Sequence, residues 1–204
     1  MPRPLRLDAQ RSELLPILAK AFSELGYRRT TTAELARRCG VRENILYRHW
    51  SDKLAMFVAA LDHVHELAIA TWQRVRGEAQ DPAHAATAIL AYESRHLGEF
   101  GNYRILFSAL GDADDPAIRA ALRRTYRSLH RAIRDTLGDE AGDAARAAEA
   151  DRVAWAILGV GTITTILGEL GLATKAQRGA LLEGIGRVLL DAAGADPSPP
   201  RSSS

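Results

Sequence analysis

The sequence predicts an all-α fold. Apolar residues recur every three or four positions through most of the 204 residues, which is the spacing of one face of a helix. The long segments are rich in alanine, leucine and arginine, which favour helices, and valine-rich segments with strand-like alternation do not occur. Glycine and proline lie at the breaks, so we expect about nine helices. A hydrophobic content of 47% is sufficient for a sizeable core.

The first helix is predicted over residues 12–25, after a flexible arm formed by residues 1–10. Gly26 ends this helix, because glycine readily adopts the left-handed conformation found after helix ends. A second, short helix begins at a threonine pair, where the hydroxyl of Thr31 can accept a hydrogen bond from a first-turn N–H. Leu35 and Ala36 form its apolar side.

A third, short helix follows the turn at Gly40. Ile45, Leu46 and Trp50 lie at roughly helical spacing and form its apolar side. The polar residues lie at its start and on its outer side: Arg42, Glu43, Asn44 and Arg48. Two short helices joined by a glycine turn, the second with polar residues at its N-terminal end, are typical of a helix-turn-helix.

Charge also separates the N-terminal end from the rest of the chain. Residues 1–53 contain eleven Lys and Arg against six Asp and Glu, whereas the whole chain has a net charge of only +2. A basic N-terminal part on a near-neutral remainder is the charge distribution expected of a separate nucleic-acid-binding domain.

The remaining residues are expected to form a body of longer helices. Asp52 or Ser51 caps the first of them, Asp115 and Pro116 begin another, and Thr174 with Gln177 provides a capping box. The expected helices run over about 53–76, 82–100, 103–110, 116–137, 150–170 and 174–193. For residues 139–150 the composition fits either a loop or a loose helical start. Residues 195–204 are expected to be disordered.

The motifs of residues 26–54 resemble the TetR family of bacterial transcriptional repressors. The resemblance comes from matching groups at Gly26-Tyr27, Thr30-Thr31, Leu35-Ala36, Cys39-Gly40-Val41, Leu46 to Trp50 and Asp52-Lys53-Leu54. It covers about a quarter of the chain, without a gap. The sequence departs from the pattern at Arg42, where the family usually has a serine or threonine as N-cap. The resemblance implies a three-helix DNA-binding head (residues 1–53) and a helical ligand-binding and dimerisation body (residues 54–194).

By this resemblance, two groups of residues would contact double-stranded operator DNA. Thr31, Tyr47 and Lys53 would bind phosphates, which fixes register without reading sequence. The start of the third helix would read bases, since Arg pairs with guanine, Asn with adenine and Glu with the cytosine amino group. Glu43 has the alternative role of orienting Arg42. The expected contact residues are Thr31, Thr32, Arg42, Glu43, Asn44, Tyr47, Arg48, His49 and Lys53.

The resemblance also implies a small organic effector held between body helices, in a pocket with aromatic walls and a few polar groups. The candidate lining residues are Trp72, Tyr92, His96, Tyr103, Phe107, Tyr126, Trp155 and Thr162. The last two long helices would pair with those of a second subunit as a homodimer, with Leu182 and Ile185 on the interface side. Gly159, Gly161 and Gly168 would let helices approach closely.

The function implied is a ligand-responsive repressor that binds a palindromic operator as a homodimer. The alternatives are an activator or ligand-independent member, and an all-α metal enzyme using Glu93 and His96. A di-iron site needs a second Glu-x-x-His pair, which the sequence lacks, so we expect no enzyme activity, cofactor or metal. The N-terminal residues have no apolar signal segment. The longest uncharged run, residues 153–168, is shorter than a bilayer span. A cytoplasmic location without membrane contact is therefore expected.

Overall fold

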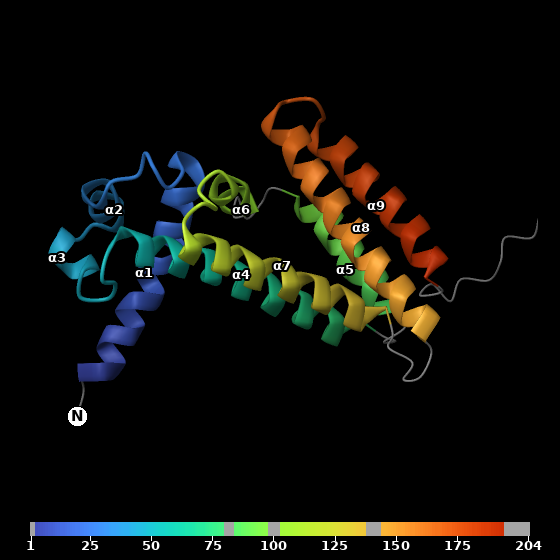
Figure 1. The fold of residues 1–204 in the computed structure, drawn as a ribbon, viewed down its shortest axis with the longest axis horizontal. Helices are drawn as coiled ribbons and strands as arrows, with labels where there is room; N and C mark the ends of the chain where they lie inside the picture. Colours follow the sequence, from blue (N-terminus) through green and yellow to red (C-terminus); the bar gives the residue numbers. More distant parts are fainter. Residues whose placement is uncertain (1–2, 80–83, 98–102, 138–143, 194–204) are drawn as a thin grey trace, which may run out of the picture. The chain divides into compact units, whose positions relative to one another are not determined.

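The computed structural model describes residues 3–79, 84–97, 103–137 and 144–193. These residues form nine α-helices and no strand, which confirms the all-α prediction (Figure 1). The helices are α1 (Arg3–Leu25), α2 (Thr32–Cys39), α3 (Glu43–Leu46), α4 (Lys53–Glu78), α5 (Ala85–His96), α6 (Tyr103–Leu110), α7 (Pro116–Thr136), α8 (Ala144–Glu169) and α9 (Lys175–Ala192).

The chain divides into two compact units. The first unit comprises Met1–Ala68 and Phe100–Tyr126, and the second comprises Ile69–Glu99 and Arg127–Ser204. Helices α4 and α7 therefore contribute residues to both units. The predicted division into a head (residues 1–53) and a body (residues 54–194) is a partition by function and stays a prediction. The predicted tail, residues 195–204, lies outside the described residues.

A single hydrophobic core holds the first unit together. Helix α1 contacts α2 and α6, and α2 contacts α3 (Figure 1). The core includes Phe22 of α1, Leu35 of α2, Leu46 of α3 and Phe57 of α4, all with no exposed area. The rings of Phe22 and Phe57 meet edge to face with their centroids 4.9 Å apart. Burying each such side chain contributes about 1.5–3 kcal/mol, so the two short helices are fixed mainly by this core.

The N-terminal end of α1 differs from the prediction. Residues 3–11 continue the helix, where a flexible arm was expected. Gln10 Oε1 lies 3.1 Å from His49 Nε2, and the guanidinium of Arg11 lies 5.6 Å from the centre of the Trp50 ring. Contacts with residues almost forty positions further along the chain thus support this first part of α1, and the local sequence gives no signal of them.

Several predicted helix signals are confirmed. Asp52 caps α4, because its Oδ1 accepts a hydrogen bond of 2.7 Å from the N–H of Ala55. Asp115 Oδ1 likewise accepts from the N–H of Ala117 at the start of α7. Helix α6 has the predicted bounds, whereas α4 continues through Gly77 to Glu78, two residues beyond its predicted end.

The second unit is built around the pair α8 and α9, which lie side by side, with α5 against α9 (Figure 1). Thr174 and Gln177 form the predicted capping box at the start of α9. Helix α8 begins at Ala144, so the described part of the segment 139–150 is helical. By length and hydropathy alone, α4 and α8 could cross a membrane, but core helices of soluble proteins meet the same criteria.

The predicted role of the glycines needs correction. A Cβ at Gly159 or Gly161 would meet no atom within 4 Å, so these two glycines do not serve close packing within the chain. The close approach occurs instead at Gly179 of α9, where a Cβ would lie 2.7 Å from the carbonyl oxygen of Ser94 on α5. Gly168 does have a close neighbour, since a Cβ there would meet the guanidinium of Arg178 at 2.5 Å.

Apolar side chains remain exposed along α8 and α9. Helical spacing places them on the side of each helix that faces away from its buried residues. Val188 is 63% exposed and Ile185 42% exposed, whereas Leu182 is only 4% exposed. The prediction that Leu182 lies on an interface side is therefore wrong, because its side chain packs inside the second unit. We call the following exposed set the apolar stripe: Ile163, Ile166, Leu170, Leu181, Ile185 and Val188.

Candidate nucleic-acid interface

The N-terminus of α2 is fixed by the predicted cap. Thr31 has an extended backbone, and its Oγ1 accepts a hydrogen bond from the N–H of Glu34. At the other end, Gly40 adopts the left-handed conformation, with φ of 64°, and its N–H bonds to carbonyls of the last turn. A threonine cap of this kind contributes about 1 kcal/mol. Both ends of α2 are thus fixed by hydrogen bonds between neighbouring residues, which the sequence predicts.

Helix α3 is shorter than predicted. It comprises Glu43–Leu46, and turns continue from it to His49. Arg42 occupies the N-cap position and makes no capping hydrogen bond with its side chain. The burial of Leu46 and Trp50 holds the segment instead. Packing therefore fixes α3 where the usual cap is missing.

One side of this segment is exposed and polar. Arg42, Asn44, Tyr47 and Arg48 are all exposed. Within the described part of the chain, Arg42, Asn44 and Arg48 have no side-chain hydrogen bond or ion pair. Two guanidinium groups and a carboxamide that are free of internal partners can bind an external acceptor or base edge. The predicted groove residues therefore lie together on one surface.

Three other predicted contact residues bond to one another. The Thr32 hydroxyl donates to Glu43 Oε2 at 2.7 Å, and the Tyr47 hydroxyl donates to Thr32 Oγ1 at 3.4 Å. This cluster joins the first residue of α2 to the first residue of α3. The sequence-based alternative in which Glu43 orients Arg42 is not what the structure records, since the carboxylate of Glu43 contacts Thr32.

His49 is partly buried against α1. Its ring contacts Gln10, as described above, and lies beside Trp50 with the ring centroids 5.4 Å apart. Burial, followed by the charges of Arg11 and Arg48, lowers the pKa of His49. The imidazole is therefore neutral at neutral pH, and it is less suited to bind a phosphate than a charged histidine would be.

Lys53 also has internal partners. Its ammonium group donates to the carbonyl oxygens of Tyr27 at 3.0 Å and Thr30 at 3.1 Å. The same nitrogen lies 4.3 Å from the centre of the Tyr27 ring. These contacts tie the start of α4 to the loop before α2, a role that the sequence analysis missed. An ammonium has three donors, so the predicted phosphate contact has at most one donor left.

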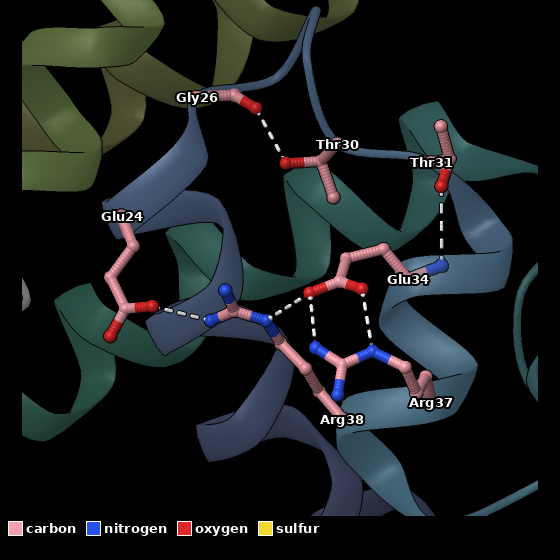
Figure 2. Close-up of polar contacts among 7 residues, drawn as sticks. All are labelled: Glu24, Gly26, Thr30, Thr31, Glu34, Arg37 and Arg38. Atoms are coloured by element: carbon pink, nitrogen blue, oxygen red, sulfur yellow. Dashed lines mark hydrogen bonds and ion pairs between the residues drawn. The ribbon is translucent and has the colours of Figure 1, made fainter.

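Acidic residues neutralise part of the basic charge of this region. Figure 2 shows Glu34 accepting hydrogen bonds from Arg37 and Arg38, while Arg38 also reaches Glu24. These bonds lower the pKa of Glu34 from 4.5 to about 2. Arg37 and Arg38 are therefore committed to the helix-turn-helix itself, and Arg42 and Arg48 are the arginines of this region that are left for an anionic partner.

Comparison with known families agrees with this geometry. Residues 18–60 match the family described as bacterial regulatory proteins, tetR family. That stretch contains α2 and α3 complete, together with the parts of α1 and α4 that pack on them. This helix-turn-helix segment is therefore of the TetR type. The resemblance inferred from the motifs is thus confirmed.

Two relatives show how far the sequence similarity extends. The HTH-type transcriptional activator FasR of Mycolicibacterium smegmatis is 30% identical over 101 residues, which are 49% of this chain and 46% of FasR. The nucleoid occlusion factor SlmA of Vibrio cholerae is 33% identical over 94 residues, which are 44% of this chain and 48% of SlmA. The matched stretch therefore spans about half the length of these relatives.

Solved structures share the fold along most of the chain. A TetR-family transcriptional regulator from Cytophaga hutchinsonii aligns with a TM-score of 0.73 at 15% identity, covering 92% of this chain and 96% of that one. FadR from Bacillus subtilis, solved in complex with stearoyl-CoA, aligns with a TM-score of 0.67 at 12% identity, covering 88% and 97%. The family that residues 18–60 match is one of regulatory proteins, which agrees with the prediction that the chain is not an enzyme.

The predicted effector residues fall into both units. Tyr103, Phe107 and Tyr126 belong to the first unit, where Tyr103 and Tyr126 pack against the hydrophobic core. The other five belong to the second unit: Trp72, Tyr92, His96, Trp155 and Thr162. Their role in binding an effector stays a prediction.

Within the second unit, most of these side chains have internal partners. The Trp72 indole N–H donates to Glu93 Oε1 at 2.7 Å, and Tyr92 stacks on His96 with ring centroids 4.0 Å apart. Trp155 is 48% exposed and stacks on His130. The carboxylate of Glu93 thus accepts the indole hydrogen bond of Trp72. Among the described residues, no group of three or more His, Cys, Asp or Glu could hold a metal ion.

Proposed function

We propose that the protein is a homodimeric transcriptional repressor, located in the cytoplasm, that binds a palindromic DNA operator and responds to a small organic effector. The observation that carries this proposal is the exposed side of α3 and the following turn, where the side chains of Arg42, Asn44 and Arg48 make no hydrogen bond or ion pair with the described residues. A recognition helix presents its N-terminal residues to base edges in the major groove.

The apolar stripe supports the homodimer. Six large apolar side chains on the outward sides of α8 and α9 are exposed in the single chain, and obligate dimer interfaces are apolar surfaces of this kind. A second copy of the chain would bury the stripe by a two-fold operation, which places the same residues on both sides of the interface. Two recognition helices then match two half-sites of a palindrome.

The effector part of the proposal rests on the aromatic residues of the body and on one similar fold. FadR, which shares the fold, is described in complex with stearoyl-CoA. An apolar or weakly polar organic molecule, such as one with an acyl chain, is accordingly the class of effector that we propose. A ligand that binds only the folded chain raises its stability by about 2.7 kcal/mol at a hundredfold excess over Kd, so a thermal-shift series of acyl compounds tests this part.

A second candidate function is activation of transcription. FasR, which is 30% identical over its matched stretch, is named an activator. Repression and activation differ in where the operator lies relative to the promoter and in the sign of the transcriptional response. Transcription in vitro from a promoter carrying the operator, with and without the protein, distinguishes them.

Binding-site selection from a random duplex pool tests the DNA-binding part. The wild-type chain should select a palindrome, and Asn44→Ala or Arg48→Ala should relax preference at particular positions by about 1–3 kcal/mol per lost bidentate contact. Lys53→Met should leave the salt dependence nearly unchanged if Lys53 acts through Tyr27 and Thr30, or reduce the slope by about one per subunit if it binds a phosphate. Selection of no sequence by the wild-type chain would contradict the proposal.

A further inference from the structure

The bond between Thr32 and Glu43 involves the only acidic side chain in the segment from Arg42 to Trp50. Glu43 is exposed and lies at the start of α3, between Arg42 and Asn44 in the sequence. Its carboxylate accepts the Thr32 hydroxyl at 2.7 Å, and the Tyr47 hydroxyl is directed to Thr32 from the other side at 3.4 Å. A negative charge is therefore bound among hydroxyl donors on the surface that is proposed to meet DNA.

We infer that Glu43 competes with DNA phosphate for the Thr32 hydroxyl and thereby makes binding selective. This inference rests on the proposed function and adds the origin of its sequence discrimination. In the free protein the carboxylate occupies the donor that a backbone phosphate would use. A phosphate of any DNA sequence must displace the Glu43 carboxylate from the Thr32 hydroxyl. Only a sequence that offers Glu43 a new hydrogen-bond donor compensates for the lost bond.

The Thr32 hydroxyl cannot donate to Glu43 and to a phosphate at the same time. A threonine hydroxyl has one hydrogen to donate, while an ionised carboxylate and a phosphate both only accept. When a phosphate takes the Thr32 hydroxyl, Glu43 loses its partner and faces a second negative charge a few ångströms away. At surface separations of this kind, the repulsion between two unit charges weakens binding about threefold to tenfold.

Compensation is available at a base edge. A glutamate can accept a hydrogen bond from the exocyclic amino group of cytosine in the major groove. Glu43 lies beside Asn44 on the exposed side of α3, so a released carboxylate is positioned for this contact. A sequence that offers the amino group recovers the hydrogen bond, while other sequences keep the repulsion. Glu43 therefore weakens binding to arbitrary DNA more than binding to the operator.

The test compares Glu43→Gln with Glu66→Gln. Both substitutions remove one negative charge and keep the side-chain size, and Glu66 is an exposed residue of α4 that lies thirteen positions, or about 20 Å, beyond Lys53 along the helix. Fluorescence anisotropy would give Kd for a random-sequence duplex and for the duplex that the wild-type chain selects from a random pool, each at several salt concentrations.

Glu43→Gln should bind the random duplex about threefold to tenfold more tightly than wild type. Its gain on the selected duplex should be smaller, or become a loss, so the ratio of the two Kd values falls. The gain on random DNA should shrink as salt rises, because salt screens exposed charges. Glu66→Gln should change both duplexes alike and by less.

A double-mutant cycle with Thr32→Val shows whether the effect passes through the hydroxyl. The effect of Glu43→Gln on random DNA should be smaller in the Thr32→Val background, because the competition has been removed. Equal effects of Glu43→Gln and Glu66→Gln, or an unchanged discrimination ratio with normal operator binding, would overturn the inference alone. Failure of the wild-type chain to bind any duplex would overturn the proposed function and the inference with it.

Discussion

The helix-turn-helix and the α8–α9 pair use the same local chemistry but leave different surfaces. In each region a threonine caps one helix, Thr31 for α2 and Thr174 for α9. In the helix-turn-helix Leu35, Leu46 and Trp50 are buried and most exposed residues are polar, whereas α8 and α9 leave the apolar stripe exposed. The exposed surface of the first region is polar, and that of the second region is apolar. An exposed apolar patch of this kind marks an interaction surface.

The largest expected effect comes from placing a charge in the apolar stripe. Val188→Glu should abolish the dimer, since it places an unpaired carboxylate in an apolar interface at a cost of several kcal/mol. Because Val188 is 63% exposed in the single chain, the fold of each chain should survive. Loss of operator binding should accompany the loss of the dimer, since two half-sites are then no longer bound together.

Light scattering and circular dichroism together measure this outcome. Ala176→Glu is the control, since it adds the same charge at an exposed position of α9 that helical spacing places on the side away from the apolar stripe. The control should remain dimeric. A wild-type mass near 22.2 kDa at micromolar concentration would remove the dimer from the proposal. A second copy of the chain would then not cover the apolar stripe.

Two glycine substitutions compare a packed position of α9 with an open position of α8. Gly179→Ala should destabilise the second unit by about 1–3 kcal/mol, as overpacked sites do, because the new Cβ would lie 2.7 Å from the backbone oxygen of Ser94. Gly159→Ala meets open space in the chain and should stabilise α8 by about 0.5–1 kcal/mol. Urea unfolding at one fixed protein concentration measures both changes.

Gly159 also reports on the dimer. Helical spacing places it on the same side of α8 as Ile163 and Ile166, so a partner helix would pass close to it. Gly159→Ala should then weaken the dimer even though it stabilises the isolated helix. If Gly159→Ala strengthened both the chain and the dimer, the partner helix would not approach α8 at this glycine.

The elements that the sequence predicted well have their signals within a few residues. Thr31, Gly40, Asp52 and Thr174 each act on a backbone group no more than five positions away, so their roles follow from residue type and spacing alone. The exposure of Arg42, Asn44 and Arg48 was likewise predictable, because the apolar periodicity assigns the opposite side of the segment to the core.

The contacts that the sequence did not predict join distant residues. Lys53 bonds to a carbonyl 26 positions earlier in the chain, and Gly179 packs on Ser94 of another helix. The start of α1 depends on contacts with His49 and Trp50. Each of these depends on how helices pack, which a local pattern does not encode. The aromatic residues of the body illustrate the same limit, since composition did not distinguish the half-exposed Trp155 from the buried Trp72.

The smallest expected effect concerns the ion pairs of the helix-turn-helix. Hydrogen bonds from Arg37 and then Arg38 lower the pKa of Glu34 to about 2 from its ordinary value of 4.5. A carboxylate whose pKa is lowered by folding stabilises the folded state above its unfolded pKa and loses that contribution as the pH falls through the folded pKa. The Glu34 contribution should therefore be complete above about pH 5 and disappear between about pH 4.5 and 2.

Glu34→Gln removes this contribution while keeping the side-chain size. Urea unfolding of the variant, measured from pH 7 to pH 2, should show a flatter loss of stability than wild type in the acid window and a small deficit at pH 7, since exposed ion pairs contribute little. Glu13→Gln is the control, because Glu13 is an exposed glutamate of α1 that has no ion pair with the described residues. A pH profile of Glu34→Gln that matched the wild-type profile would mean that Arg37 and Arg38 do not hold Glu34 in solution. Both arginines would then be available to DNA, as Arg42 and Arg48 are. The helix-turn-helix would in that case leave more unpaired groups on its surface, and its contrast with the exposed apolar stripe of α8 and α9 would be smaller.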